Sequence, residues 1–174
     1  LTALWTSTNG IDWQPNPSPT APISGAVITH GNGKWVLAFG NPDYYWWPGQ
    51  ILVSDDLVNW DSMFTNSVSI LGACYGGGRF VAARADGAFL LSSNAVNWED
   101  PWPDPGLPPL QELEFLNGRF WGLAYDQFAF SPDGIQWTNS AGPTNTGPLW
   151  SVAYGAGRYV AGGDYRTVWT STDG

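Results

Sequence analysis

Apolar residues fall into short runs along this chain, such as 151–154 and 159–162, and turn-forming residues separate the runs. Gly and Pro are scattered through the sequence, and no window keeps a helical period. Short apolar runs bounded by Gly, Pro, Asn and Asp are typical of β-strands. The pattern therefore predicts an all-β fold of many short strands.

One polar motif recurs, in which Ser is followed by Asn or Asp and then by Trp. It occupies residues 7–13, 54–60, 92–98 and 131–137, and a fifth copy begins at Ser171. A spacing of roughly forty residues is typical of architectures in which each repeat is a small β-sheet. We call this motif the box and expect repeat boundaries near Trp13, Trp60, Trp98 and Trp137, with the fifth copy cut at Gly174.

A second motif, a glycine turn followed by a basic and an aromatic residue, runs in phase with the box. It occupies residues 31–35, 76–80 and 155–159, while 116–120 keeps only the second Gly. Each unit then contains four strands: one before the glycines, one after them, one leading into the box Ser and one starting at the box Trp. Four antiparallel strands per repeat indicate a β-propeller blade, and residues 1–174 form a single repeat domain.

The box resembles the Asp-box, or BNR repeat, of sialidases and other bacterial propellers. The resemblance covers nearly the whole chain, although Asn stands at Asn9 and Asn94, and the family box usually has one more residue before Trp. It implies a β-propeller in which the box is a structural turn between the third and fourth strands, away from any active site. Ser and Asx side chains in such a turn hydrogen-bond to its own backbone N–H groups.

The composition limits the partners. The formal net charge is −9 with only six Lys and Arg residues, so no basic patch is available for nucleic acid. No apolar run reaches the length of about 18 residues that spans a membrane. No sequence pattern indicates a cofactor or a metal site, and the lone Cys74 is predicted to be buried in a strand. The acidic balance favours an extracellular protein or one on a cell or virion surface.

Binding residues are expected in the loops opposite the box, where repeat proteins vary. Residues 44–47 are four consecutive aromatics in a loop, which predicts a platform for a sugar ring or an apolar protein surface. A long loop that buries its own aromatics is the alternative. The predicted ligand-binding residues are Tyr44, Tyr45, Trp46, Trp47, Asp86, Trp102, Asp164, Tyr165 and Arg166.

An enzyme is the less favoured interpretation, and no catalytic residue is assigned. A sialidase site needs a cluster of arginines, yet Lys34, Arg79, Arg119 and Arg158 share one structural repeat position. Only Arg84 and Arg166 remain. A glycosidase pair of carboxylates stays open, because several loop aspartates share the predicted rim. They are Asp43, Asp86, Asp100, Asp126 and Asp164.

The favoured function is a non-catalytic recognition or adhesion module that binds glycan or protein through its loop rim. The alternatives are a glycoside hydrolase and a structural block of a filament, phage tail or surface assembly. Residues 4–10 and 168–174 have nearly the same sequence, so a closed four-bladed wheel has room for only one of them. We therefore expect a window from a larger wheel, with a closed four-bladed propeller as the alternative and self-association through open repeat ends as a further prediction.

Overall fold

The chain is all-β in the computed structural model, which describes residues 4–16, 19, 25–40, 48–101, 106–142, 148–164 and 167–173. The described residues form strands and turns without a helix, and every strand pair is antiparallel. None of the described segments is therefore a helix long and apolar enough to cross a membrane. The prediction of an all-β chain is confirmed.

The strands form five separate sheets in chain order. The first is the hairpin of β1 (Leu4–Thr6) and β2 (Gln14–Asn16), followed by the sheet of β3 (Val27–Gly31), β4 (Lys34–Phe39), β5 (Gly49–Ser54) and β6 (Asp61–Asn66). The next contains β7 (Ile70–Gly76), β8 (Arg79–Arg84) and β9 (Phe89–Ser92). The last two contain β10 (Glu112–Leu116), β11 (Arg119–Leu123), β12 (Gln127–Ser131) and β13 (Thr138–Ala141), and then β14 (Leu149–Gly155), β15 (Arg158–Gly163) and β16 (Val168–Ser171).

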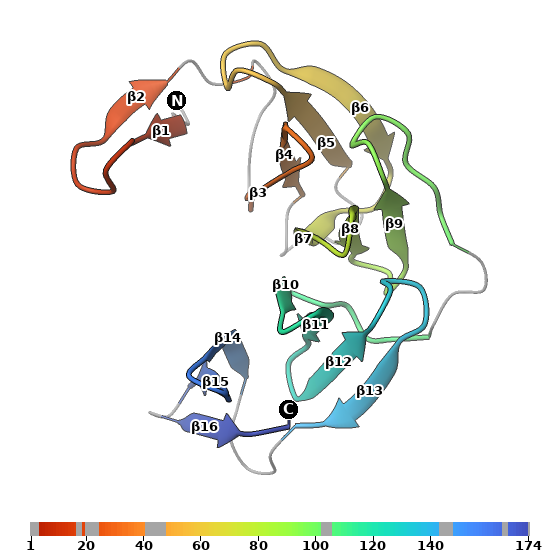
Figure 1. Ribbon diagram of the computed structural model, residues 1–174. Coiled ribbons are helices and arrows are strands. Elements are labelled where there is room, and N and C mark those ends of the chain that lie inside the picture. The colour runs from red at the N-terminus through yellow and green to blue at the C-terminus, as the bar shows by residue number, and fades with distance from the viewer. Residues whose placement is uncertain are drawn as a thin grey trace.

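The sheets follow one another along an arc (Figure 1). The first strands β3, β7, β10 and β14 lie on its inner side, and β6 and β13 lie on its outer side. The arc is open between the β1–β2 hairpin and the β14–β16 sheet. A closed four-bladed wheel required residues 11–15 to pair with 167–171. Instead β2 pairs with β1 and β16 pairs with β15, so that alternative is wrong for this structure.

The four-strand prediction fails in the unit that contains β7–β9. Its fourth strand is reduced to a single bridge, in which Leu91 and Glu99 exchange two backbone hydrogen bonds of 2.9 Å. Pro101 follows two residues later, and proline has no N–H to extend a ladder. The fourth strands β2, β6 and β13 each begin one residue after the box Trp.

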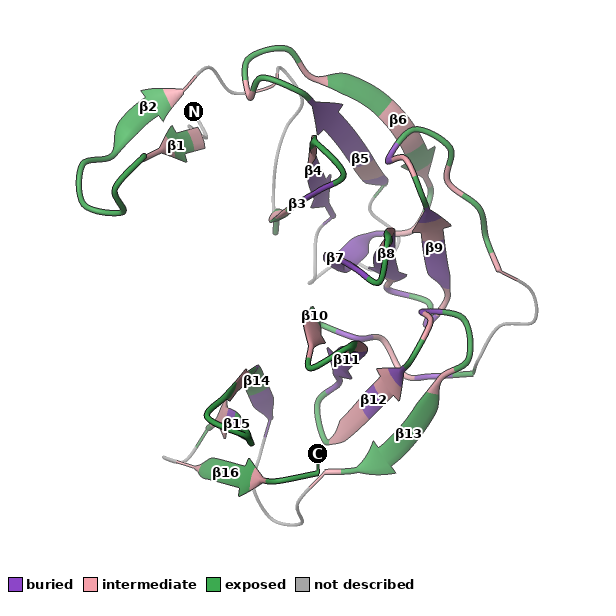
Figure 2. Cartoon of the chain, viewed as in Figure 1, coloured by how far each residue is buried: buried purple, intermediate pink, exposed green. Residues whose placement is uncertain are grey.

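The hydrophobic core lies between neighbouring sheets, and the buried residues concentrate in the middle of the arc (Figure 2). Val36 and Ile51 of one sheet share a cluster with Phe80 and Leu90 of the next. Cys74 is buried in the following junction, as predicted, and burial raises the pKa of its thiol. Each sheet therefore depends on its neighbours to cover its two apolar faces.

The first glycine of the turn motif permits close approach between sheets. A Cβ atom on Gly76 would lie 1.9 Å from Cγ of Phe115 in the next sheet, and one on Gly31 would lie 2.0 Å from Cγ of Tyr75. Nothing lies within 4 Å of the same atom on Gly155. The glycine therefore permits close packing at these two junctions, whereas Leu116 takes the same repeat position in the β10–β13 sheet, which the β14–β16 sheet follows.

Candidate recognition surface

The box residues are occupied by their own turn. Ser131 Oγ accepts hydrogen bonds from the backbone N–H groups of Asp133 (3.3 Å) and Gly134 (2.8 Å). Asp133 Oδ1 accepts two more from residues 135 and 136, and the Trp137 indole N–H donates to the Gly134 carbonyl at 3.0 Å. The other three complete boxes repeat the Asx and indole contacts. The box therefore stabilises the fold and leaves few groups for a ligand.

Hydrogen bonding lowers the pKa of the box aspartates. Burial is the largest single influence on Asp133 and acts to raise its pKa, but the N–H groups of Gln136 and Ile135 outweigh it, so the pKa falls below its usual value. The N–H groups of Asn59 and Val58 lower the pKa of Asp56 in the same way. Asn9 and Asn94 accept the same bonds without carrying a charge.

The opposite edge of the sheets carries the irregular connections, and we call it the loop edge. In the sheets that contain β7–β9, β10–β13 and β14–β16, a backbone hydrogen bond joins the second-to-third-strand connection to the segment that enters the same sheet or leaves it. Ala85 donates to the Ser69 carbonyl at 2.9 Å, and Asp164 donates to the Pro148 carbonyl at 3.0 Å. Gly142 donates to the Asp126 carbonyl at 2.8 Å. These backbone hydrogen bonds hold the connections of the loop edge together. The loop edge includes Asp86, Asp126 and Asp164.

Most of the predicted binding residues lie outside the described residues. These are Tyr44, Tyr45, Trp46, Trp47, Trp102, Tyr165 and Arg166. Asp86 and Asp164 are described, in the connections after β8 and β15. They belong to sheets that are separated by the β10–β13 sheet, and they have different partners.

Asp86 is part of an ion-pair group around Arg84. The Arg84 guanidinium binds Asp86 through Nη2 and Asp100 through Nη1, the latter at 2.8 Å. The Arg84 side chain is only 12% exposed, and its Nε is buried without a hydrogen-bond partner. Two carboxylates therefore already neutralise the guanidinium, and a ligand carboxylate would have to displace one of them.

Trp150 is a loop-edge residue that the sequence reasoning missed. The β14–β15 register shifts between Leu149 and Ser151, so Trp150 is the extra residue of a β-bulge. Its side chain is exposed (56%), and its indole N–H donates to Asp164 Oδ1 at 2.8 Å. The only sequence signal is an aromatic residue at the repeat position that Leu71 occupies in β7.

A second exposed aromatic lies close to Trp150. The Tyr125 carbonyl accepts a backbone hydrogen bond of 3.4 Å from Leu149, and the Tyr125 side chain is 60% exposed. The loop edge thus holds an exposed indole bonded to a carboxylate, and the backbone of an exposed tyrosine from the neighbouring sheet is hydrogen-bonded to the residue before that indole. Such a surface has flat apolar faces with polar groups beside them, which suits sugar rings.

Glu112 is a described carboxylate whose environment favours the neutral form. It is half-buried in β10, where burial raises the pKa of its carboxyl and the nearby Glu114 charge raises it further. The Ser151 hydroxyl donates to Oε1 at 3.3 Å and partly offsets both effects. Oε2 is buried without a partner. Sequence reasoning missed Glu112 because a charged residue in a strand is expected to face solvent.

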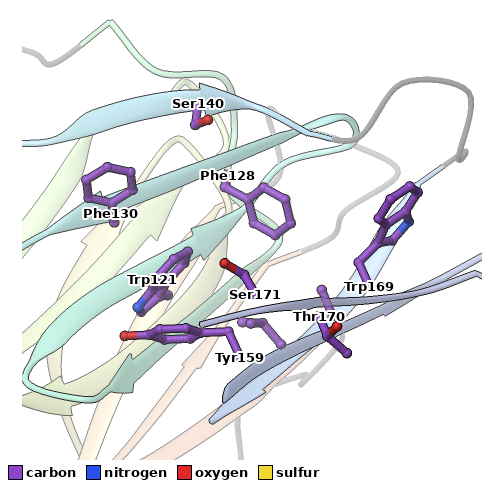
Figure 3. A pocket seen from close by; sticks show the side chains of 10 residues that line it. Trp121, Phe128, Phe130, Ser140, Tyr159, Trp169, Thr170 and Ser171 are labelled. Carbon is purple, nitrogen blue, oxygen red and sulfur yellow. The ribbon is translucent and has the colours of Figure 1, made fainter. Parts of the chain in front are cut away.

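An apolar cavity of about 160 Å³ lies between the β10–β13 and β14–β16 sheets. The rings of Trp121, Phe128, Phe130 and Tyr159 gather around it, and Thr170 and Ser171 of β16 border it (Figure 3). A larger, polar cavity of about 340 Å³ lies beside the box at 92–97, on the opposite edge from Trp150.

No family model matches this chain, and no curated protein matches it. Solved structures do match. The chain is similar to the computationally designed Ika8 protein, with a TM-score of 0.64 and 15% identity over 91% of this chain and 49% of that one. It is also similar to the computationally designed Ika4 protein, with a TM-score of 0.63 and 14% identity over 91% of this chain and 97% of that one. The chain thus spans about half the length of Ika8, and at these identities the likeness concerns the fold alone.

Proposed function

We propose that this chain is a non-catalytic recognition or adhesion module that binds glycan through the loop edge, on a β-propeller of the Asp-box type. The proposal of an Asp-box β-propeller rests on the box turns, the glycine turns and the open arc of antiparallel sheets. Four-stranded blades in a larger wheel would continue this arrangement. The acidic composition supports a location outside the cell or on a surface.

The observation that carries the proposal is the exposed indole of Trp150, fixed by its bond to Asp164. A ring that is both exposed and oriented loses little conformational freedom when a ligand stacks on it. Tyr125 extends the apolar area, and carboxylates at Asp126 and Asp164 can accept hydrogen bonds from sugar hydroxyls. The occupied guanidinium of Arg84 makes an anionic sugar a poorer ligand than a neutral one.

The test is a glycan array probed with the chain and with the variants Trp150→Ala and Asp164→Asn. We expect neutral glycans to bind, and Trp150→Ala to weaken binding by a factor of ten or more, since a binding hot spot costs more than about 1.4 kcal/mol. Trp5→Ala is the matched control, because Trp5 is equally exposed but lies in the N-terminal hairpin. Glycan binding that survives Trp150→Ala, or binding to proteins alone, would contradict the proposal.

A glycoside hydrolase is the second candidate function. The observation that favours it is the half-buried Glu112 carboxyl with its raised pKa. A carboxyl with a raised pKa can remain protonated and act as a general acid, and a second carboxyl, Glu114, lies nearby with a pKa that burial also raises. The test is release of reducing sugar from the glycans that bind. Turnover that Glu112→Gln abolishes, while binding is retained, would make the chain an enzyme.

A further inference from the structure

The polar cavity of about 340 Å³ lies on the edge of the sheets that carries the boxes, opposite the loop edge. Its walls come from the turn between β7 and β8 and from the box at 92–98. Ile135 contributes from the box of the next sheet. Sites for small ligands have volumes of about 300 to 1,000 Å³, so this cavity can hold a small molecule.

The cavity lies where the turn between β7 and β8 has glycine and two other turns have asparagine. The Asn32 side-chain amide donates to the Ser93 carbonyl of the next sheet at 3.3 Å. In the same repeat position, Asn117 donates to the Tyr159 hydroxyl of the sheet after its own at 3.1 Å. Gly77 holds this position in the cavity wall and has no side chain to cross the junction. Space that an amide bridge occupies at two junctions is therefore open at this one.

Arg79 lines the cavity and forms no ion pair within the part of the chain that the structure describes. Its equivalent, Lys34, pairs at 2.7 Å with Asp55, the second residue of the box in the same sheet. Ser93 holds that box position beside Arg79 and carries no charge. Arg79 acts on Asp133 of the neighbouring box only through its charge, and Asp133 Oδ1 is already bound by its own turn. The guanidinium can therefore bind a ligand carboxylate.

Asn94 and Asn97 of the cavity wall lack the side-chain bond that their equivalents form. In the preceding box, Asn59 Nδ2 donates to Asp56 Oδ2 at 2.8 Å. Asn94 Oδ1 accepts two backbone N–H groups at 2.9 Å, so its remaining side-chain atom is the donor Nδ2 where Asp56 has an acceptor. Asn97 consequently cannot repeat the bond of Asn59, and its side chain has no hydrogen bond to any described residue. Both amides can therefore bind a ligand.

Glu99 places the opposite charge in the same cavity. Glu99 and Arg79 are both described, and they do not form an ion pair with each other. A simple anion would be repelled by Glu99 and by the net charge of −9, whereas a molecule with one carboxylate and one ammonium group complements both side chains. Leu91 and Ile135 add apolar surface to the wall.

We propose that this cavity binds a free α-amino acid with an aliphatic side chain. The carboxylate of the ligand binds the Arg79 guanidinium and the Asn94 amide, and its ammonium group binds Glu99. The aliphatic side chain lies on Leu91 and Ile135. This site is separate from the proposed glycan site, because it lies on the other edge of the sheets.

The test is isothermal titration calorimetry of the whole 174-residue chain with L-leucine and L-valine. Isocaproate lacks the ammonium group of leucine, and isoamylamine lacks its carboxylate. We expect leucine to bind saturably at one site. Each analogue should bind at least tenfold more weakly, because it leaves one charge of the cavity without a partner.

Two variants restore groups that the equivalent units contain and should close the site without unfolding the chain. Gly77→Asn supplies the missing amide: a Cβ atom there meets nothing closer than 3.7 Å, and the φ of 54° is close to those of the equivalent asparagines. Ser93→Asp supplies Arg79 with the carboxylate that Lys34 has. Each should weaken leucine binding at least tenfold with an unchanged melting temperature. Arg158→Ala is the matched control, because it removes the same repeat residue away from the cavity.

The result that would overturn the proposal is a lack of saturable binding for both amino acids. Binding of either analogue as strong as that of leucine, or leucine binding that survives both Gly77→Asn and Ser93→Asp, would overturn it as well. Trp150→Ala should leave leucine binding unchanged, since Trp150 lies on the loop edge. Glycan binding can therefore fail while amino-acid binding holds, and the reverse.

Discussion

Two junctions built from the same repeat differ in whether they are filled. Between the β7–β9 and β10–β13 sheets, Trp137 stacks on Phe89, and Phe89 is buried. Between the β10–β13 and β14–β16 sheets, Phe128 holds the position of Phe89 but borders a cavity. The turn positions differ as well, since the Phe115 ring packs on Gly76 at the first junction, whereas Leu116 takes that position at the second.

The difference shows that each repeat forms a sheet with an apolar face. Whether that face is buried depends on the sheet that packs against it. The box turn forms with the same hydrogen bonds at Trp13 as at Trp137, because all its partners lie within seven residues. Burial of the indole needs a sheet that is distant in sequence. The free energy of a repeat array is accordingly a sum of repeat and interface contributions.

The largest expected effect is a difference in unfolding free energy between alanine variants of Phe89 and Phe128. Phe89→Ala should lower the free energy of unfolding by about 3–5 kcal/mol, because it removes a buried ring and leaves a cavity beneath Trp137. Phe128→Ala should cost about half as much, because one side of its ring lacks packing partners. Urea unfolding measures both, and equal losses would show that the two junctions are equally packed.

Trp137→Ala and Trp13→Ala compare the same box residue in the two settings. Trp137→Ala should cost about 3 kcal/mol, the lower end of the range for a core Trp, since its ring is half-buried. Trp13→Ala should change stability by less than about 0.5 kcal/mol at concentrations where the chain is monomeric. A large loss for Trp13→Ala in the monomer would mean that its indole is already part of a core.

Acid should lower the stability of the chain by protonating Asp133, whose box ends in the Trp137 that packs on Phe89. The pKa of Asp133 is lower in the folded chain than in the unfolded one, so its contribution is present above the unfolded value near 3.8 and is lost as pH falls through the folded pKa. Asp133→Asn should therefore reduce the loss of unfolding free energy that occurs below about pH 4. The reduction should be roughly 1 kcal/mol or less. Asn94→Ala is the control, since removing an uncharged box residue lowers stability without changing its pH dependence.

The smallest expected effect concerns Glu112, whose side chain accepts a hydrogen bond from Ser151 across the open junction. Its pKa is raised on folding, so the folded state is favoured most below the unfolded value near 4.5 and loses this advantage as pH rises through the folded pKa. Glu112→Gln should stabilise the chain at pH 7 by about 0.5 kcal/mol, given partial solvent screening, and have no effect near pH 3. Thermal melting at the two pH values measures this, and a loss at pH 7 would show that the charge is stabilising.

The sequence by itself determined the repeat, the strand order within each unit and the box turns. These features rest on alternation and on hydrogen bonds between residues close in the chain, as at Ser131 and Asp133. The sequence also indicated that Cys74 is buried. It overstated the fourth strand of the unit with β7–β9, because the effect of Pro101 on the ladder outweighed the repeat pattern.

Only the tertiary structure decided which copies of a repeated residue are buried. Trp13 and Trp137 have the same local sequence context, yet one is exposed and the other stacks on Phe89. The bulge that exposes Trp150 and the two carboxylates that occupy Arg84 are likewise invisible in the sequence. The physical reason is that burial, like the pairing of Arg84 with Asp100, depends on residues brought together from separate parts of the chain, whereas a turn depends only on its own residues.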